Sequence, residues 1–206
     1  MLLCGCSPLM QGSLDTFKAA VQGVEPLQLT AADVAAVPYA QILVTTASSE
    51  GVMAKLRQQG DLQYWVASGK QVLLMRNGLV VRTSGLQPGL DGTHFDGQSP
   101  FKRGLQRVID GERSTRWVDM SQGDQVGLEV NSRFVRKGLE TLTILDKPYV
   151  LQRIDEKIDI PALGFSGTNR YWIRPDDGVI LQSEQYVTPG LELRIVHLRP
   201  DWEASQ

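Results

Sequence analysis

The sequence predicts an all-β protein, with a single antiparallel β-barrel-like or sandwich domain and short helices near the N-terminus. Three observations indicate this class. Apolar and β-branched residues recur in short runs, roughly five to eight residues long, from residue 39 to residue 199. Asparagine-glycine and aspartate-glycine pairs separate several of these runs. The 20 glycines and 10 prolines among 206 residues supply the many turns that this arrangement needs.

Composition bounds the class of protein. With 42% hydrophobic and 21% charged residues, the chain is an ordinary globular protein able to bury one substantial core. Its net charge of -2 provides no broad positive field, so we expect no nucleic-acid partner. No apolar stretch is long enough for a membrane-spanning helix. Since no shift in composition marks a second domain, we expect residues 13–206 to form the single β domain.

Two short helices are expected before the strands begin. Within residues 13–23, Leu14, Phe17 and Val21 recur at helical spacing and form one apolar stripe. Thr30 to Asp33 resembles a capping box, which predicts the start of a second helix.

The first expected strands run from Ala40 to Thr46 and through a three-stranded meander over residues 62–83. Asn77-Gly78 lies between two apolar runs of that meander. It predicts a tight hairpin, because type I′ turns require positive φ at both central residues. Residues 84–100 are rich in glycine and proline and are expected to form a loop, followed by a short helix over residues 101–110.

The rest of the chain is expected to form strands. The alternation of Glu140 to Leu145 indicates one wet face and one buried face. The turn Pro175 to Gly178 predicts a hairpin between its flanking runs. The strands expected after residue 110 are Thr115–Met120, Val126–Lys137, Glu140–Asp146, Val150–Ile158, Asn169–Arg174, Val179–Tyr186 and Leu191–Leu198. Together with the earlier ones they make about ten.

No constellation for catalysis or cofactor binding stands out, so we expect no catalytic residue, metal or cofactor. Only two histidines, His94 and His197, could serve as a base. Residues 164–168 fall one residue short of a nucleophile elbow. Asp91 to Asp96 holds three potential metal ligands, but its Asp and Gly residues are more typical of a turn.

Several carboxylates could in principle form the pair that glycoside hydrolysis requires, but no spacing in the sequence pairs them. The segment from Asp155 to Asp159 is interpreted as a solvated strand end, and the Asp176-Asp177 pair as turn formers. The candidates are Asp119, Glu129, Asp155, Glu156, Asp159, Asp176, Asp177 and Glu184.

Aromatic residues beside arginines form the remaining candidate site. Exposed aromatic faces with adjacent hydrogen-bond donors could contact a glycan or a protein partner. For any single tryptophan, however, the favoured interpretation is that it belongs to the core, and the arginines are then ordinary outward residues. The candidates for contact are Trp65, Trp117, Arg170, Tyr171, Trp172 and Arg174.

The two cysteines, Cys4 and Cys6, lie in the first six residues and cannot staple a core. The segment Leu3-Cys4-Gly5-Cys6 resembles the bacterial lipobox, which makes Cys6 the expected lipidation site. Residues 1–12 are then a truncated signal remnant and tether. Because only Met1 and Leu2 precede this segment, we expect a start codon further upstream or a trimmed chain. The alternative is a cytosolic protein with two incidental cysteines.

The order and spacing of several segments resemble the YjbF/GfcB family of bacterial lipoproteins, which is linked to group 4 capsule and related exopolysaccharide operons. The resemblance covers nearly the whole chain and implies a barrel-like fold, an outer-membrane anchor and no established catalytic residues. The segments that carry it are Leu29–Ala40, Tyr64–Ala67, Asn77–Thr83, Arg116–Asp119, Asn169–Gly178 and Arg199-Pro200.

The leading interpretation is a non-enzymatic lipoprotein on the periplasmic face of the outer membrane that assists production or secretion of capsule or exopolysaccharide. Its expected partners are an outer-membrane β-barrel protein, periplasmic proteins of the export system, or the polysaccharide. One alternative is a periplasmic lipid or lipoprotein carrier with an apolar barrel interior. The other is a glycan-modifying enzyme, which would need two carboxylates in one cleft.

Overall fold

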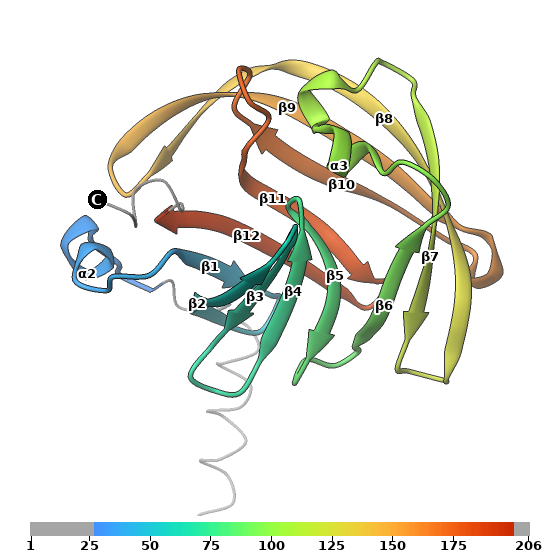
Figure 1. Cartoon of the computed structure of the whole chain (residues 1–206), viewed down its shortest axis with the longest axis horizontal. Helices are drawn as coiled ribbons and strands as arrows, with labels where there is room; N and C mark the ends of the chain where they lie inside the picture. The colour runs from blue at the N-terminus through green and yellow to red at the C-terminus, as the bar shows by residue number, and fades with distance from the viewer. Residues whose placement is uncertain (1–26, 200–206) are drawn as a thin grey trace, which may run out of the picture.

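A computed structural model of the chain describes residues 27–199 and shows an antiparallel sheet curled almost into a closed barrel (Figure 1). The expected helix over residues 13–23 and the cysteines lie outside the described residues. No helix in the described part of the chain has the length and apolar character needed to cross a bilayer.

The described part contains twelve strands and four short helical segments. The strands are β1 (Gln41–Thr45), β2 (Glu50–Gln59), β3 (Leu62–Val66), β4 (Val72–Arg76), β5 (Leu79–Ser84), β6 (Leu90–Phe95), β7 (Arg113–Met120), β8 (Gln125–Ile144), β9 (Lys147–Ile160), β10 (Phe165–Ile173), β11 (Ile180–Thr188) and β12 (Leu191–Arg199). The helical segments are α2 (Ala31–Ala35), α3 (Pro100–Arg103), η1 (Leu105–Arg107) and η2 (Pro161–Leu163).

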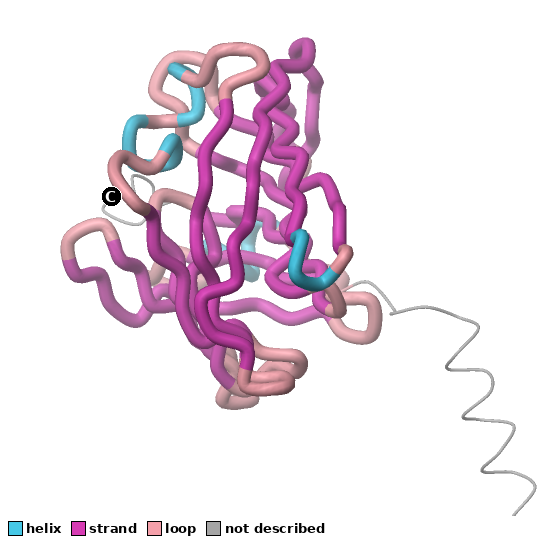
Figure 2. The backbone as a smooth tube through the Cα atoms, turned by 90° about the vertical axis from the view of Figure 1, so that its right-hand side faces the viewer, coloured by secondary structure: helices cyan, strands magenta, loops and turns pink. Residues whose placement is uncertain are grey.

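Every strand pairs antiparallel with its neighbours, in the order β5-β4-β3-β2-β1-β12-β11-β10-β9-β8-β7-β6. The two end strands, β5 and β6, are consecutive in the chain and lie side by side (Figure 1). The sheet therefore curls back on itself, and the view turned by 90° shows this curvature (Figure 2). The backbone N–H of Leu90 donates to Thr83 Oγ1 at 2.8 Å across this junction. The all-β prediction is confirmed, as a barrel.

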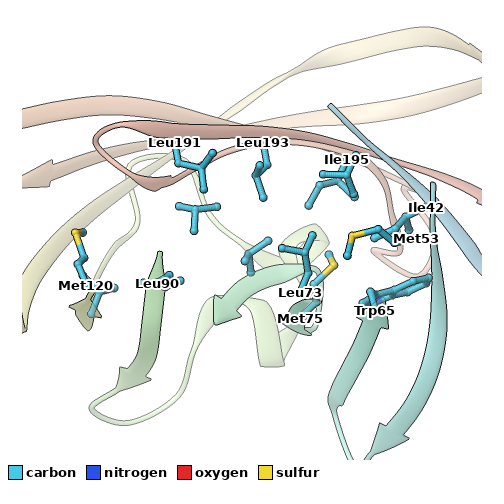
Figure 3. Packing of buried hydrophobic residues seen from close by; sticks show 14 of the residues in the cluster. Ile42, Met53, Trp65, Leu73, Met75, Leu90, Met120, Leu191, Leu193 and Ile195 are labelled. Carbon is cyan, nitrogen blue, oxygen red and sulfur yellow. The ribbon is translucent and has the colours of Figure 1, made fainter. Parts of the chain in front are cut away.

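The main core fills the barrel interior. Figure 3 shows Leu191, Leu193 and Ile195 of β12 facing Leu73 and Met75 of the opposite wall. A second cluster closes one end, where Phe101 of α3 and Leu105 of η1 cover inward side chains of β8 and β10. Large, nearly inaccessible side chains fill this interior, among them Trp65, Tyr171, Phe134, Ile42 and Ile154.

A third cluster lies on the outer face of the sheet. Because side chains alternate along a strand, Trp172 and Val196 point opposite to their inward neighbours Tyr171 and Ile195. The far end of the β8–β9 hairpin folds over this outer face and packs Ile144 and Leu151 there. Val34 of α2 completes the cluster.

Local turn and cap chemistry is confirmed where the sequence predicted it. Thr30 and Asp33 form the capping box of α2, with Thr30 N–H donating to Asp33 Oδ2 at 2.9 Å. Asn77 and Gly78 both have positive φ, at 50° and 82°, as a type I′ turn requires. Strands β3, β4 and β5 are the expected meander.

Two predictions about residues 84–110 are wrong, and one strand was not predicted. Residues 84–100 contain β6, and residues 50–59, which were not expected to be a strand, form β2. Both strands carry mostly polar side chains and are stabilised by backbone pairing with neighbours distant in sequence. The helix expected over 101–110 is divided into α3 and η1 at Gly104, whose φ of 93° ends the first turn.

The two strands expected at 126–137 and 140–146 are one strand, β8. A shift of register between Arg136 and Leu139 bends it and its partner β9 without breaking their pairing. This bend lets the hairpin curve back over the outer face of the sheet. Within it, the predicted alternation is confirmed, since Thr141 and Thr143 are exposed while Ile144 is buried.

Candidate functional site

The aromatic residues proposed as a contact surface do not come together. Trp65 is 1% exposed in the main core, and Tyr171 is 0% exposed in the cluster at the barrel end. Trp172 is buried under the β8–β9 hairpin, where its indole N–H donates to Glu140 Oε2 at 2.6 Å. These three rings offer no exposed face, because inward and outward apolar layers enclose them, and the two tryptophans are core residues as the favoured interpretation expects.

The other three candidates lie at or near the surface. Arg170 donates to Glu184 Oε2 at 2.7 Å, and Arg174 pairs with Asp177 in the turn before β11. Trp117 is half-buried on β7 and stacks on exposed His94 of β6, with ring centroids 5.6 Å apart. Its contact with a glycan or partner stays a prediction.

The segment interpreted as a solvated strand end is partly an interior site. Lys157 and Asp159 are exposed as expected, but Asp155 and Glu156 are buried, at 6% and 0% exposure. Asp155 faces outward and is held by Arg153, whose Nε lies 2.7 Å from its Oδ1. Glu156 faces the barrel interior instead. The prediction is wrong there because Arg116, distant in sequence, compensates its charge.

Glu156 is the centre of a buried polar network. Arg116 forms an ion pair with its Oε1, which also accepts a hydrogen bond from Ser132 Oγ at 2.6 Å. Its Oε2 accepts from Asn169 Nδ2 at 2.8 Å and from the hydroxyl of Tyr171 at 3.0 Å. All four partners are themselves buried. Satisfying every oxygen of a carboxylate in this way makes a charge tolerable inside a barrel.

The network perturbs the pKa of two groups. Burial raises the pKa of Glu156, but the charge of Arg116 and the hydrogen bonds from Ser132 and Asn169 outweigh it, and the net pKa is lowered. Burial and the neighbouring Glu156 carboxylate raise the pKa of Tyr171 well above its ordinary value. The hydroxyl of Tyr171 is therefore a stable donor. Among the described residues, the hydrogen-bond and ion-pair partners of Glu156 include no second carboxylate.

An open groove lies on the outer face of the barrel, over β7, β8, β9 and β10, which run side by side (Figure 1). Its volume is about 1000 Å³. The backbone of Gly167, which carries no side chain, forms part of its floor. The outward side chains that line it are Arg113, Asn131, Arg133, Lys157, Asp159, Ser166, Thr168 and Arg170.

The register of the sheet aligns three cations in this groove. Arg113 of β7 is directly opposite Arg133 of β8, and Arg133 is directly opposite Lys157 of β9. All three side chains are exposed. Within residues 27–199 they have no ion-pair or hydrogen-bond partner, whereas Arg170 at the rim is paired with Glu184. The result is a row of three adjacent positive charges on a protein of net charge -2.

Acidic side chains are scarce in the groove. Asp159 is the one carboxylate among its described lining residues, and it accepts a hydrogen bond from Ser166 Oγ at 3.0 Å. Hydrolysis of a glycosidic bond requires a second carboxyl group across the cleft. In the part of the chain that the structure describes, no group of three or more His, Cys, Asp or Glu residues is arranged to hold a metal ion.

Sequence reasoning did not single out the three cations. Each lies in a different strand, and only the pairing registers of β7, β8 and β9 show that they are neighbours. The alternation of side chains along each strand does place Arg113, Arg133 and Lys157 on the outward face. The sequence therefore indicates the face of each cation but not that the three are neighbours.

Comparisons with known proteins agree with this architecture. The chain is 23% identical to the "Uncharacterized lipoprotein GfcB" of Escherichia coli (strain K12) over 203 residues, which cover 97% of this chain and 94% of that protein. The crystal structure of the hypothetical lipoprotein YmcC from Escherichia coli (K12) has a TM-score of 0.77 and 21% identity, covering 96% of this chain and 98% of YmcC. That similarity shows a shared fold.

The family model described as "Group 4 capsule polysaccharide lipoprotein gfcB, YjbF" matches residues 14–198, which include all twelve strands except the last residue of β12. The match extends over most of the chain, as the resemblance in the sequence implied. The chain therefore belongs to the YjbF family of group 4 capsule polysaccharide lipoproteins.

Proposed function

We propose that this protein is a non-enzymatic, lipid-anchored accessory of capsule or exopolysaccharide production or secretion, and that it binds the glycan on its outer face. The observation that carries the proposal is the open polar groove over β7–β10, in a chain of the capsule polysaccharide lipoprotein family. Its hydroxyl, amide and cationic side chains offer donors to a passing polymer, and its single carboxylate is insufficient for hydrolysis.

The proposed anchor is Cys6, acylated at the periplasmic face of the outer membrane. Each buried methylene of an acyl chain contributes about 0.8 kcal/mol to membrane binding, so two or more chains hold a protein stably. Residues 7–26 separate Cys6 from the first described residue. The anchor would thus leave the barrel, and the groove on its outer face, in contact with water.

A filled interior counts against the alternative of a lipid carrier. A carrier needs a lumen with room for acyl chains. Here large apolar side chains such as Trp65 and Phe134 occupy the interior, and the Glu156 network places a charged pair among them. We therefore expect purified protein to carry no acyl chain other than its own anchor.

The test is a gene deletion in a strain that makes the polysaccharide, complemented by the wild type or by Cys6→Ser. We expect deletion to reduce surface polysaccharide, wild type to restore it, and Cys6→Ser to restore it poorly because it lacks the anchor. Unchanged surface polysaccharide after deletion would reject the proposal.

Co-purification of tagged wild type and Cys6→Ser identifies what is bound. We expect polysaccharide in the eluate of the wild type and a smaller amount in the eluate of Cys6→Ser. An outer-membrane β-barrel protein without polysaccharide would indicate docking on the exporter instead. Free acyl lipid in both eluates would favour the carrier.

A further inference from the structure

We infer that the groove over β7–β10 is a binding site for an acidic polysaccharide, and that Arg113, Arg133 and Lys157 contact its carboxylate groups. This inference rests on the proposed function, since it names the class of glycan and the residues that recognise it. The observations that carry it are the alignment of these three cations, their lack of partners and the chemistry of the side chains around them.

The geometry of the row matches a polymer that crosses the strands. Cross-strand partners in an antiparallel pair share one face of the sheet, so the three side chains project from the same outer face. Neighbouring strands lie about 4.8 Å apart, so the row spans roughly 10 Å. An extended chain laid across β7, β8 and β9 would meet one cation per strand.

The row is unfavourable without a ligand. Like charges at directly opposite positions of an antiparallel pair destabilise it. Two consecutive pairs, Arg113 with Arg133 and Arg133 with Lys157, have this arrangement. Two other arginines on the outer face are paired with carboxylates, Arg153 with Asp155 and Arg170 with Glu184. An anionic ligand would relieve the repulsion in the groove.

The neighbouring side chains favour a sugar over other anions. Asn131, Ser166 and Thr168 line the same groove and can exchange hydrogen bonds with hydroxyl groups. Among the described residues that line the groove, Tyr186 carries the one aromatic ring, so most contacts with a sugar chain would be polar or charged.

Other anionic macromolecules fit less well. Membrane-surface binding by a folded domain combines cations with exposed apolar side chains. The outward side chains that line this groove are polar or charged, apart from the ring of Tyr186 at its edge. Nucleic acid requires more phosphate contacts than three cations provide, and the whole chain is negatively charged.

The binding test uses the folded protein without its anchor, as Cys6→Ser, with polygalacturonate as the acidic probe and dextran as the neutral one. We expect the Cys6→Ser protein, whose groove is unaltered, to bind polygalacturonate and not dextran. Its affinity should fall as the salt concentration rises, because the contacts are between exposed charges. Replacing two of the cations by the uncharged glutamine, as Arg133→Gln with Lys157→Gln, should weaken binding at least about tenfold, because two charge-assisted contacts are lost.

Arg82→Gln is the matched control. Arg82 is an exposed arginine within β5 that, like the groove cations, has no partner among the described residues. We expect its removal to change affinity by less than about twofold. The inference would be overturned if the double variant and Arg82→Gln bound polygalacturonate with equal affinity. It would also be overturned if the protein with the unaltered groove did not bind polygalacturonate. Tighter binding to phosphatidylglycerol vesicles than to polygalacturonate would assign the groove to a membrane.

Stability gives an independent readout. Removing Arg133 relieves both repulsive pairs, so Arg133→Gln should raise the urea midpoint of the free protein while weakening binding. A higher midpoint with unchanged binding would mean that the row is not a ligand site.

Complementation separates the two proposals. If deletion reduces surface polysaccharide and the Arg133→Gln/Lys157→Gln variant restores it fully, the accessory function stands and the acidic-glycan site is rejected. If deletion has no effect while polygalacturonate still binds in the groove, the site stands and the accessory function is rejected.

Discussion

At the scale of single residues, Glu156 shows how the barrel tolerates a charge in its interior. An unpaired carboxylate at 0% exposure would neutralise itself by raising its pKa. Arg116 and the donors Ser132, Asn169 and Tyr171 prevent this, and the lowered pKa of Glu156 reflects their combined effect. The network connects β7, β8, β9 and β10 from the inside, directly behind the strands that carry the groove on their outer face.

We expect Glu156→Gln to lower the free energy of unfolding at pH 7 by about 3 kcal/mol, because it leaves the buried Arg116 charge uncompensated. The measurement is urea unfolding followed by tryptophan fluorescence. Glu192→Gln, at an exposed carboxylate of β12, is the control and should change stability by less than about 0.5 kcal/mol. If Glu156→Gln lowered the free energy of unfolding no more than the control does, the buried charge of Arg116 would not need Glu156 for its compensation.

The same pair predicts a pH dependence. The pKa of Glu156 is lower in the folded protein than in the unfolded chain, where it is about 4.3. The unfolded chain therefore takes up the proton first as pH falls, and the stabilisation from Glu156 is lost progressively below about pH 4.3. We expect the stability difference between wild type and Glu156→Gln to narrow between pH 5 and pH 3. A constant difference would contradict this linkage.

At the scale of elements, turn geometry sets the path of the chain. The β4–β5 hairpin turns at Asn77-Gly78. A Cβ on Gly78 would lie 2.3 Å from Cδ1 of Ile180, the first residue of β11. Gly78 is therefore required both for its positive φ and for the close approach of the hairpin to β11. Gly60, in the β2–β3 turn, also has positive φ, but nothing lies within 4 Å of its ideal Cβ.

The two glycines separate strain from packing. We expect Gly78→Ala to cost about 3 kcal/mol, from the left-handed backbone and the clash with Ile180. Gly60→Ala should cost about 1 kcal/mol, from the backbone alone. Chemical denaturation of both variants measures the difference, and equal losses would show that the approach of Ile180 adds nothing.

At the scale of the whole molecule, the barrel is held together by contacts between segments far apart in the chain. Gln185 of β11 reaches the β4–β5 hairpin: its Oε1 accepts from Val80 N–H at 3.0 Å, and its Nε2 donates to the carbonyl of Gly78 at 2.8 Å. With the Leu90–Thr83 hydrogen bond at the junction of β5 and β6, this side chain ties the end of the sheet to its middle.

We expect Gln185→Leu to cost about 3 kcal/mol, because it leaves a buried N–H and a carbonyl without partners while preserving side-chain volume. Amide hydrogen exchange should rise at Val80 and its neighbours in β5. Gln58→Leu, at an exposed position of β2, serves as the control and should leave exchange in β5 unchanged. Unaltered protection of Val80 in Gln185→Leu would contradict the role of this link.

The features that can be read from the sequence are those that depend on residues close together in the chain. The capping box of Thr30, the Asn77-Gly78 turn and the alternation in β8 each depend on residues a few positions apart, so their patterns are readable without a fold. The antiparallel all-β class and the resemblance to the YjbF family follow from the order of such segments. Of the candidate site, the sequence indicated only which residues could face outward.

Tertiary structure alone decided the rest, because strand pairing is non-local. Strands β2 and β6 have one buried side chain each, Met53 and Leu90, and exist through backbone pairing with their neighbours. Glu156 is tolerated in the interior because Arg116, two strands away on β7, forms an ion pair with it, and Trp172 is covered by a hairpin that bends back. The row of cations exists because two registers coincide, that of β7 with β8 and that of β8 with β9. A slip of one residue in either of them would turn a charge to the other face.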